Sequence, residues 1–348
     1  MNELLRQLTE ATGVSGAEKE VRLLIRDLIA DYVDEWSVDT MGNLLATRRG
    51  TGESDLRVMV DAHMDEVGLL VVELEGNGML KFVTVGGFDD RALLGKVVQV
   101  GPQKVTGVIG ARAIHLLKSN EYSKVVKVDA MRIDIGAKNK DAAAGKVKVG
   151  DYAAFVTPYE ESSAPGGRTA IGKAFDNRAG CAALIELLRG ERYPFDLVAA
   201  FTVQEEVGLR GAEVAAYRVR PDAALVLECT PAFDLPNEKD VSPNVALGRG
   251  PSIYVMDART IQDPRLVAHI TRTADAHAIP YQIRQPGGGG TNTGAIQRAA
   301  AGIPVATIAV PGRYAHTPTL MISLDDYDNV VRLADAVLRG LTADIVRR

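Results

Sequence analysis

Residues 197–208, LVAAFTVQEEVG, join an apolar run with the character of a β-strand to two adjacent carboxylates, Glu205 and Glu206. A run with helical spacing begins directly behind them, near Leu209. Two acids at the end of a buried strand need cationic partners, because an unpaired buried charge is strongly disfavoured. Taken alone, the pair could equally lie in a solvated loop. The rest of the chain decides between these two interpretations.

The sequence around this stretch alternates between strands and helices. Strand character is found in residues 43–47, 56–62, 197–203, 223–228, 252–256, 281–284 and 305–310. Helical spacing is found in residues 4–8, 17–32, 175–189, 211–217, 264–277, 293–301 and 324–341. Ser15, with Glu18 three residues on, is the expected N-cap of the helix over 17–32. This alternation predicts an α/β fold, with a mixed, mostly parallel sheet sandwiched by helices.

Residues 67–158 have a different texture. Short β-rich runs at 68–74, 80–85, 96–100 and 107–110 are separated by Gly, Asn and Asp, and no long amphipathic helix is present. This pattern is typical of a small all-β barrel or sandwich. We therefore expect two domains, an α/β domain made of residues 1–66 and 164–348 and an inserted β-barrel of residues 67–163.

Composition limits the partners and the compartment. The 348 residues carry a net charge of −5, from 40 basic and 45 acidic side chains, which argues against nucleic acid or an anionic membrane as a partner. Cys181 and Cys229 do not make a disulfide framework, and no apolar run has the length of a membrane span. The N-terminus lacks the pattern of a signal peptide. We expect a cytoplasmic protein.

Polar residues recur where predicted strands end, which is where ligands bind in open α/β sheets. They are His63 and Asp65 after 56–62, Glu205 and Glu206 after 197–203, Glu228 at the end of 223–228, His316 after 305–310, and Asp176 just before a helix that starts near Arg178. Each has a simpler interpretation. Asp176 could be an N-cap, His316 a loop residue, and Glu228 the partner of an arginine. One shared site explains all of them together.

Two histidines and five carboxylates form a ligand set that suits Zn²⁺, Co²⁺ or Mn²⁺. So many anions exceed the need of one divalent ion and fit two ions that share a bridging carboxylate. In a strand-like segment residues i and i+2 point the same way, so Asp65 could orient the imidazole of His63. Of two adjacent glutamates, one could bind metal and the other serve as general base.

At these residues the chain resembles the cytosolic dinuclear metallo-aminopeptidases, which include glutamyl, deblocking and tetrahedral aminopeptidases and some members once labelled endoglucanases. The resemblance covers nearly the whole chain in order. It rests on VDAHMDEVG (60–68), VGGFDDRALLGKVVQV (85–100), GVIG (107–110), VDAMRIDIGA (128–137), GKAFDNRAGCAAL (172–184), TVQEEVGLRGA (202–212), LECTPAFDLP (227–236), GGGTNTGAI (288–296) and PGRYAHTP (311–318).

The resemblance implies a catalytic α/β domain of zinc-peptidase type, with the phosphorylase/hydrolase-like fold. It implies two divalent ions per chain, Zn²⁺ or Co²⁺ with Mn²⁺ as an alternative. The first would be held by His63, Asp176 and Glu228, and the second by Asp176, Glu206 and His316. Glu205 would be the general base and Asp65 the residue that orients His63. The chain departs from the expected pattern at Glu228, which is Asp in some relatives, and at Gly312, where a basic residue is expected.

The expected function is removal of N-terminal residues from peptide substrates. The alternatives are a glycoside hydrolase, another dinuclear amidohydrolase or deacylase, and a non-catalytic assembly protein. By the same resemblance the inserted barrel would mediate dimerisation, and the homo-oligomer would be a dimer or a tetrahedral dodecamer.

Several other residues keep two interpretations. The glycines of 287–290 could present N–H groups to a substrate carbonyl or form a plain loop. Arg249, Arg284 and Arg313 could meet a substrate carboxylate, although solvated side chains are the default. The histidines expected to have ordinary surface or core roles are His115, His269 and His277. Cys181 should be core, and Cys229 should point away from Glu228.

Overall fold

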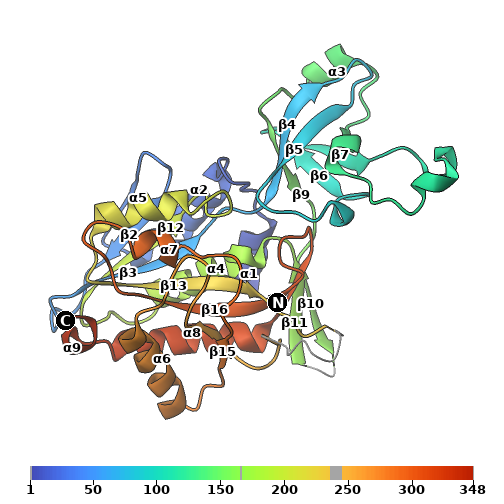
Figure 1. Ribbon diagram of the computed structural model, residues 1–348. Coiled ribbons are helices and arrows are strands. Elements are labelled where there is room, and N and C mark those ends of the chain that lie inside the picture. Colours follow the sequence, from blue (N-terminus) through green and yellow to red (C-terminus); the bar gives the residue numbers. More distant parts are fainter. Residues whose placement is uncertain (1, 165–166, 236–244, 348) are drawn as a thin grey trace.

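Strand β12 (Asp196–Thr202), which directly precedes the loop of Glu205 and Glu206, lies near the centre of a large sheet in the computed structural model (Figure 1). The structure describes residues 2–164, 167–235 and 245–347. Within them the sheet has 11 strands. Its main order is β1 (Glu35–Val38), β2 (Leu44–Arg48), β12, β3 (Arg57–His63), β13 (Ala223–Pro231), β16 (Val305–Arg313), β17 (Leu320–Ser323), β11 (Gly167–Gly172) and β10 (Glu160–Ala164). Strands β14 (Ser252–Tyr254) and β15 (Gln282–Arg284) extend from β16.

The centre of the sheet is parallel and its flanks are antiparallel. Strands β12, β3, β13 and β16 run in one direction, while β1, β2, β17, β11 and β10 pair antiparallel. The register sets Thr202 opposite His63, so β12 and β3 end side by side. The predicted mixed sheet is confirmed, with its parallel part confined to the centre and to the short β14–β15 pair.

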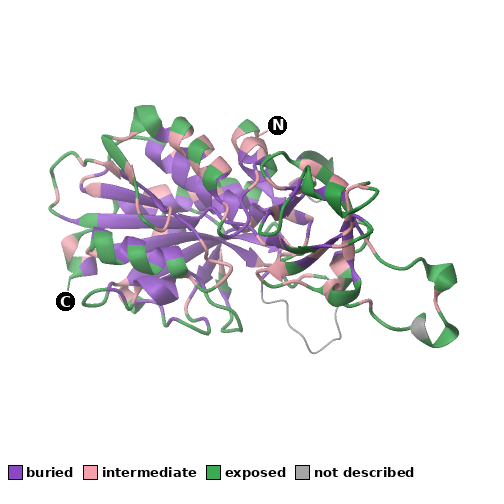
Figure 2. Ribbon diagram, turned by 90° about the horizontal axis from the view of Figure 1, so that it is seen from above, coloured by how far each residue is buried: buried purple, intermediate pink, exposed green. Residues whose placement is uncertain are grey.

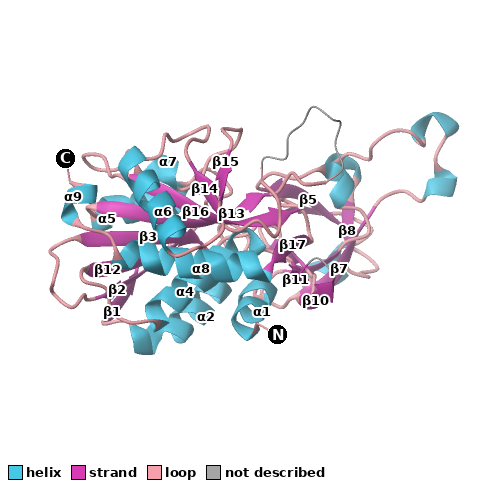
Figure 3. Ribbon diagram, turned by 90° about the horizontal axis from the view of Figure 1, so that it is seen from below, coloured by secondary structure: helices cyan, strands magenta, loops and turns pink. Residues whose placement is uncertain are grey.

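Helices cover both faces of this sheet, as predicted. One face carries α1 (Glu3–Glu10), α2 (Lys19–Ile29), α4 (Phe175–Arg189), α6 (Pro264–Ala276) and α8 (Leu324–Arg339) (Figure 3). The other carries α5 (Arg210–Val219) and α7 (Thr293–Ile296), which pack through small residues such as Ala212 and Ala295. The central strands are buried between these layers (Figure 2). Helix α9 (Ala343–Val346) follows α8, and none of the helices in the described residues is long and apolar enough to cross a membrane.

A closed antiparallel barrel stands beside the sheet (Figure 1). Its strands, in order around the barrel, are β4 (Gly68–Leu74), β5 (Leu80–Val85), β8 (Arg132–Asp134), β7 (Val105–Gly110), β6 (Val97–Val100) and β9 (Tyr152–Phe155). It has its own apolar core, which includes Leu69 and Ile133. Helix α3 (Lys140–Ala144) lies in the same segment, with short 3-10 helices at Asp90–Ala92, Ile114–Leu116, Ser119–Glu121 and Val128–Ala130.

The predicted inserted barrel is therefore confirmed as a fold. The domain boundaries at 66/67 and 163/164 stay predictions. The last barrel strand ends at Phe155, and β10 already belongs to the large sheet.

Two local predictions were wrong. Ser15 does not cap α2, whose N-cap is Glu18 without a side-chain hydrogen bond, because the Ser15 hydroxyl bonds to Asp65 instead. The helix predicted over 293–301 stops at Ile296, and Ala300 takes a left-handed φ of 51° that a continuing helix excludes.

Candidate metal centre

All seven residues predicted at strand ends lie together at the carboxyl edge of the parallel strands. His63 is the last residue of β3, and Glu205 and Glu206 follow β12 directly. Glu228 lies within β13, and His316 lies between β16 and β17. Asp65 follows His63 by two residues, and Asp176 stands at the non-helical start of α4. Since neighbouring parallel strands end at the same edge, distant segments supply one site.

Asp176 links two groups of ligand atoms. In each group the atoms lie within 4.8 Å of one another, and the groups are His63, Asp176 and Glu228, and Asp176, Glu206 and His316. One oxygen of Asp176, Oδ1, is 3.2 Å from Nε2 of His63, and the other, Oδ2, is 3.8 Å from Nε2 of His316. The N-cap interpretation of Asp176 was wrong, because its carboxylate faces two histidines rather than the helix.

Each histidine is held through its other ring nitrogen. Nδ1 of His63 is 3.2 Å from the backbone oxygen of Asp65 and 3.4 Å from its Oδ1. Nδ1 of His316 is 3.1 Å from the backbone oxygen of Gly87. Oxygen acceptors at both Nδ1 atoms place the proton there and leave Nε2 free to face the carboxylates, as metal-binding histidines require. Gly87 follows β5, so the barrel side of the chain contributes to the site.

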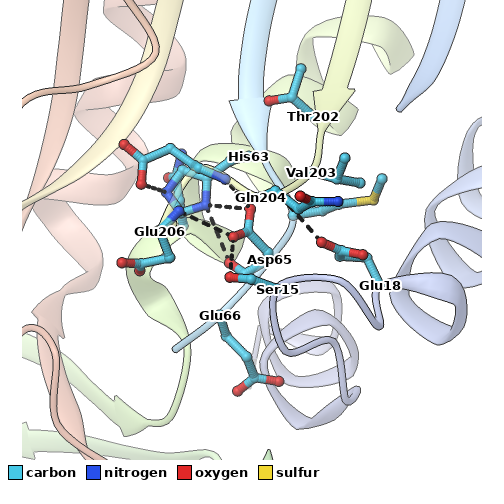
Figure 4. A network of polar contacts seen from close by, with 12 residues as sticks. Ser15, Glu18, His63, Asp65, Glu66, Thr202, Val203, Gln204 and Glu206 are labelled. Carbon is cyan, nitrogen blue, oxygen red and sulfur yellow. Dashed lines mark hydrogen bonds and ion pairs between the residues drawn. The ribbon is translucent and has the colours of Figure 1, made fainter. Parts of the chain in front are cut away.

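Asp65 organises the loop that carries the two glutamates (Figure 4). Its carboxylate accepts hydrogen bonds from the hydroxyl of Ser15 at 2.6 Å and from the N–H groups of Glu205 and Glu206 at 3.0 and 3.2 Å. Asp65 is fully buried, which by itself would raise its pKa, but its partners His63, Ser15 and the Glu205 amide hold that pKa below the usual range. The predicted orientation of His63 by Asp65 therefore extends to Glu205 and Glu206.

A second carboxylate supports the same loop. Oε1 of Glu18 accepts the N–H of Gln204 at 3.3 Å, and Gln204 has a left-handed φ of 56° (Figure 4). Left-handed φ values also occur at Ala174, at 55°, and at His316, at 58°. Non-glycine residues adopt this conformation only when their surroundings impose it, and such residues gather at functional sites. Sequence patterns did not identify Ser15 or Glu18 as parts of the site, because Ser15 and Asp65 are 50 residues apart.

Without cations the cluster is electrostatically costly. Burial, followed by the charges of neighbouring carboxylates, raises the pKa of Glu205 and Glu206 well above the usual range, and burial raises that of Glu228. Burial would lower the pKa of His63, but Glu228, Asp176, Asp65 and Glu205 together raise it well above its usual range. The carboxylates thus gather around too few positive charges.

The residues present fit divalent metal ions. Oε2 of Glu228 is buried and has no hydrogen-bond partner, which leaves one lone-pair donor free beside Asp176 and His63. Imidazole nitrogens and carboxylate oxygens form the ligand set that Zn²⁺, Co²⁺ and Mn²⁺ accept. A divalent cation in each group would offset the repulsion between the carboxylates.

Cys229 and Gly312 lie against each other. As expected, Cys229 is a buried small residue that points away from Glu228: it packs in the same apolar cluster as Leu227, while Val226 belongs to the cluster on the other face of the sheet. A Cβ atom at Gly312 would lie 2.8 Å from Sγ of Cys229. The absence of the expected basic residue at Gly312 therefore makes room for this sulfur. Cys181, as predicted, is a buried core residue, and its Sγ lies 3.2 Å from the backbone oxygen of His63.

Most of the remaining predictions for single residues were correct. His115 and His277 are exposed, and His269 is buried with Nε2 2.9 Å from the backbone oxygen of Val337. Two arginines differ from the solvated default. Arg313 forms a two-pronged pair with Asp234 at 2.7 and 2.6 Å, and Arg284 is buried.

A cavity of about 300 Å³ opens over the cluster. Beyond the metal-site residues, its wall includes Tyr254, Arg284 and the glycines at 288–290. The glycine-rich loop thus lies at the site, although Asn292 behind it turns inward and donates to the carboxylate of Asp61 at 2.8 Å. Two larger cavities in the described chain, of about 520 and 500 Å³, are lined by none of the predicted site residues.

Comparison with known proteins agrees with this geometry. The family model of the M42 glutamyl aminopeptidases matches residues 42–333. A TET aminopeptidase from a marine-sediment archaeon of the Thaumarchaeota superposes with a TM-score of 0.93 at 36% identity, over 99% of this chain and 97% of that one. The TET1 peptidase of Pyrococcus horikoshii superposes with a TM-score of 0.85 at 33% identity, over 97% and 99%.

A curated relative extends the comparison. The lysyl aminopeptidase of Pyrococcus furiosus is 31% identical over 97% of both chains. Together with the family model, which covers most of the sequence, these relatives identify the class of enzyme. The chain belongs to the M42 glutamyl aminopeptidase family and is a peptide-bond hydrolase.

Proposed function

We propose that this chain is a metal-dependent aminopeptidase that removes N-terminal residues from peptides at a site for two divalent ions. The observation that carries the proposal is the carboxylate of Asp176, whose two oxygens face His63 and His316 separately. One carboxylate shared by two ligand groups is the arrangement that a pair of ions needs. The donor set favours Zn²⁺ or Co²⁺, with Mn²⁺ as the alternative.

The side chains would divide the work. The ions would be held by His63, Asp176 and Glu228 on one side and by Asp176, Glu206 and His316 on the other. Bound divalent ions would supply polarisation of the scissile carbonyl and activation of the attacking water. Glu205 belongs to neither group that contains Asp176, and its pKa is raised by burial and by neighbouring carboxylates. It is therefore suited to take the proton of the attacking water and pass it to the departing amine.

The anionic wall of the cavity supports action at the free N-terminus of a peptide. An α-ammonium group that enters the cavity meets carboxylates and not a neutral surface. The family description names glutamyl residues and the P. furiosus relative is named for lysyl residues, so we carry neither preference over to this chain. No observation on the described residues favours the glycoside hydrolase alternative.

The test compares leucyl-p-nitroanilide with its Nα-acetylated form. The chain should hydrolyse the free amine and leave the acetylated substrate intact. Chelation should abolish the activity, and Zn²⁺, Co²⁺ or Mn²⁺ should restore it. Hydrolysis that persists in the dialysed, chelator-treated protein would refute the metal dependence. Equal cleavage of both substrates would refute the exopeptidase assignment.

We further propose that the chain forms a homo-oligomer, with residues 67–163 as a dimerisation domain inserted into a catalytic domain of residues 1–66 and 164–348. The P. horikoshii TET1 peptidase assembles into a tetrahedron or an octahedral shell. Supporting this proposal, large apolar side chains of the inserted segment are exposed, among them Ile114, Leu116 and Tyr122. Light scattering should give a mass of at least two chains, up to a dodecamer, and a monomer at micromolar concentration would refute the proposal.

We place the protein in the cytoplasm. Both cysteines are free thiols in buried positions, which suits a reducing compartment. Fractionation of cells that express the tagged chain should recover it with cytoplasmic markers.

A further inference from the structure

Arg284 is a buried cation that has no anionic partner among the residues that the structure describes. It ends β15 on the wall of the cavity over the metal cluster, and it is 6% exposed. Its Nε and Nη1 atoms are buried without a hydrogen-bond partner, and Nη2 makes one long bond, 3.3 Å, to the backbone oxygen of Gly288. Among the ion pairs formed by the described residues, none includes Arg284.

Two other buried cations of this chain, Arg178 and Lys173, have hydrogen-bond and charge partners. Arg178, which is fully buried, donates to backbone oxygens of Met64 and Leu8 and lies 3.5 Å from Glu66. Lys173 lies 2.7 Å from Glu66. Because burial of an unpaired charge is strongly unfavourable, a guanidinium that stays buried without such partners indicates a ligand that completes it.

Tyr254 holds Arg284 in position on the wall of this cavity. The Cζ atom of Arg284 lies 4.5 Å from the centre of the Tyr254 ring, and the two residues are directly paired across β14 and β15. The hydroxyl of Tyr254 donates to Oγ1 of Thr230 at 2.9 Å. Tyr254 lines the same cavity as the residues of the metal cluster. The ring stabilises the cation but accepts none of its N–H bonds in the plane of the guanidinium.

No acid of the cavity wall serves as the missing partner. Asp257 lines the same cavity, but its Oδ1 accepts the N–H groups of Arg259 and Thr260 at 2.7 and 2.8 Å. Its Oδ2 faces the hydroxyl of Thr291 at 3.4 Å. The remaining acids on the wall belong to the metal cluster, where divalent ions would use their charge. The planar fork of an arginine matches a carboxylate better than any other common anion of a peptide.

We propose that Arg284 binds a carboxylate of the substrate and so determines which peptides this site prefers. The inference rests on the aminopeptidase function proposed above. The carboxylate has two possible sources, the side chain of an acidic N-terminal residue and the C-terminus of a dipeptide. Both carry a negative charge into the cavity on a substrate whose N-terminus lies at the metal cluster.

Two pairs of substrates separate these sources. The first pair is α-glutamyl-p-nitroanilide and glutaminyl-p-nitroanilide, which have nearly the same shape and differ in the charge of the side chain. The second pair is the dipeptide Leu-Gly and leucyl-glycinamide, which differ in the charge of the C-terminus. We expect the charged member of one pair to have a kcat/KM about 10- to 100-fold above its neutral partner, the range of a hydrogen bond to a charged group.

Variants link that selectivity to Arg284. In Arg284→Gln the selected ratio should fall to about one, and in Arg284→Lys, which keeps the charge and loses the fork, it should be intermediate. Arg272→Gln, a matched change at an exposed position of α6, should leave the ratio as it is in the parent chain. Thermal melting of each variant checks that it folds.

The outcomes are distinct. If the ratio of kcat/KM between the charged and the neutral substrate were below about threefold for both pairs, the parent chain alone would overturn the inference. The test therefore does not depend on whether Arg284→Gln folds. A high ratio that survives in Arg284→Gln would also overturn it, because another group would then bind the carboxylate. If the parent chain hydrolysed none of these substrates or leucyl-p-nitroanilide, the aminopeptidase function itself would fail and this inference with it.

Discussion

Replacement of Glu205 by glutamine tests the proton-transfer role most sharply, because it keeps the shape of the side chain and removes its charge and proton affinity. The side chain of Glu205 is 12% exposed, and the backbone N–H of the residue is held by Asp65 at 3.0 Å. Glutamine can retain that backbone bond. The position of the side chain should therefore change little while its chemistry is lost.

The substitution should change two quantities, kcat and the stability of the metal-free protein. A general base contributes about 10²- to 10⁴-fold, so kcat should fall by that factor, or about 3–5 kcal/mol of transition-state free energy. Ligand atoms of Glu205 and Glu206 lie within 4.8 Å of each other, and two unit charges at that distance repel by about 3 kcal/mol at an effective dielectric constant of 20. Proton uptake reduces this cost, because the pKa of Glu205 is raised by burial and by neighbouring carboxylates. The metal-free variant should thus be more stable than the metal-free parent by about 1–3 kcal/mol.

The assay measures three quantities on the same samples. These are kcat and KM with leucyl-p-nitroanilide, the metal content per chain, and urea unfolding in the presence of a chelator. Glu213→Gln, at an exposed position of α5, is the matched control. Hydrolysis at the parental rate by a metal-loaded Glu205→Gln would refute the role of base. A loss of metal together with activity would instead make Glu205 a ligand.

Three further predictions concern the surroundings of the site. Ser15→Ala removes a 2.6 Å hydrogen bond to the charged Asp65, so the free energy of unfolding should fall by about 1.5–3 kcal/mol. In the same variant kcat should fall by a larger factor than KM changes. Ser15→Thr keeps a hydroxyl group and should restore part of the stability and part of kcat. Gly312→Arg should destabilise the chain by about 1–3 kcal/mol, because a Cβ atom at position 312 would lie 2.8 Å from Sγ of Cys229. In a double-mutant cycle, adding Cys229→Gly should recover most of this loss. For the metal-free chain, Glu205, Glu206, Glu228 and His63 have raised pKa values in the folded state, so folding binds protons. Melting temperatures should therefore fall as the pH rises from about 5 to 9 in the presence of chelator, and a flat profile matching that of the metal-loaded protein would contradict the proton uptake.

The sequence predicted the sheet and the site because both follow local rules. The apolar runs that became β3, β12, β13 and β16 are continuous and buried, as central parallel strands require. Polar residues at the ends of such strands meet at one edge, so the predicted site residues could be collected without coordinates. Short β runs separated by Gly, Asn and Asp likewise indicated the barrel.

The contacts that complete the site depend on pairings that no local pattern encodes. Ser15 bonds to Asp65 across 50 residues, and His316 to Gly87 across 229. The fit between Cys229 and Gly312 arises because β13 and β16 lie side by side in parallel register. The lack of an anionic partner for Arg284 could not be predicted either, because a sequence shows which cations are present but not which anions lie beside them.

Short edge strands were missed for a different reason. Strand β10 has the sequence EESSA and β1 is largely exposed, so neither shows an apolar run. Their pairing is stabilised by hydrogen bonds to β11 and β2 rather than by burial of their own side chains.

The central claim is that Asp176 is shared by two metal ions, and counting metals in protein purified without added metal tests it most directly. Elemental analysis of the parent chain should find up to two divalent ions per chain, and saturation with Zn²⁺ or Co²⁺ should reach two. In Asp176→Asn the binding of both ions should be weakened, because one carboxylate belongs to both ligand groups. A parent chain that contains no metal and hydrolyses aminoacyl-p-nitroanilides at its full rate would contradict the account.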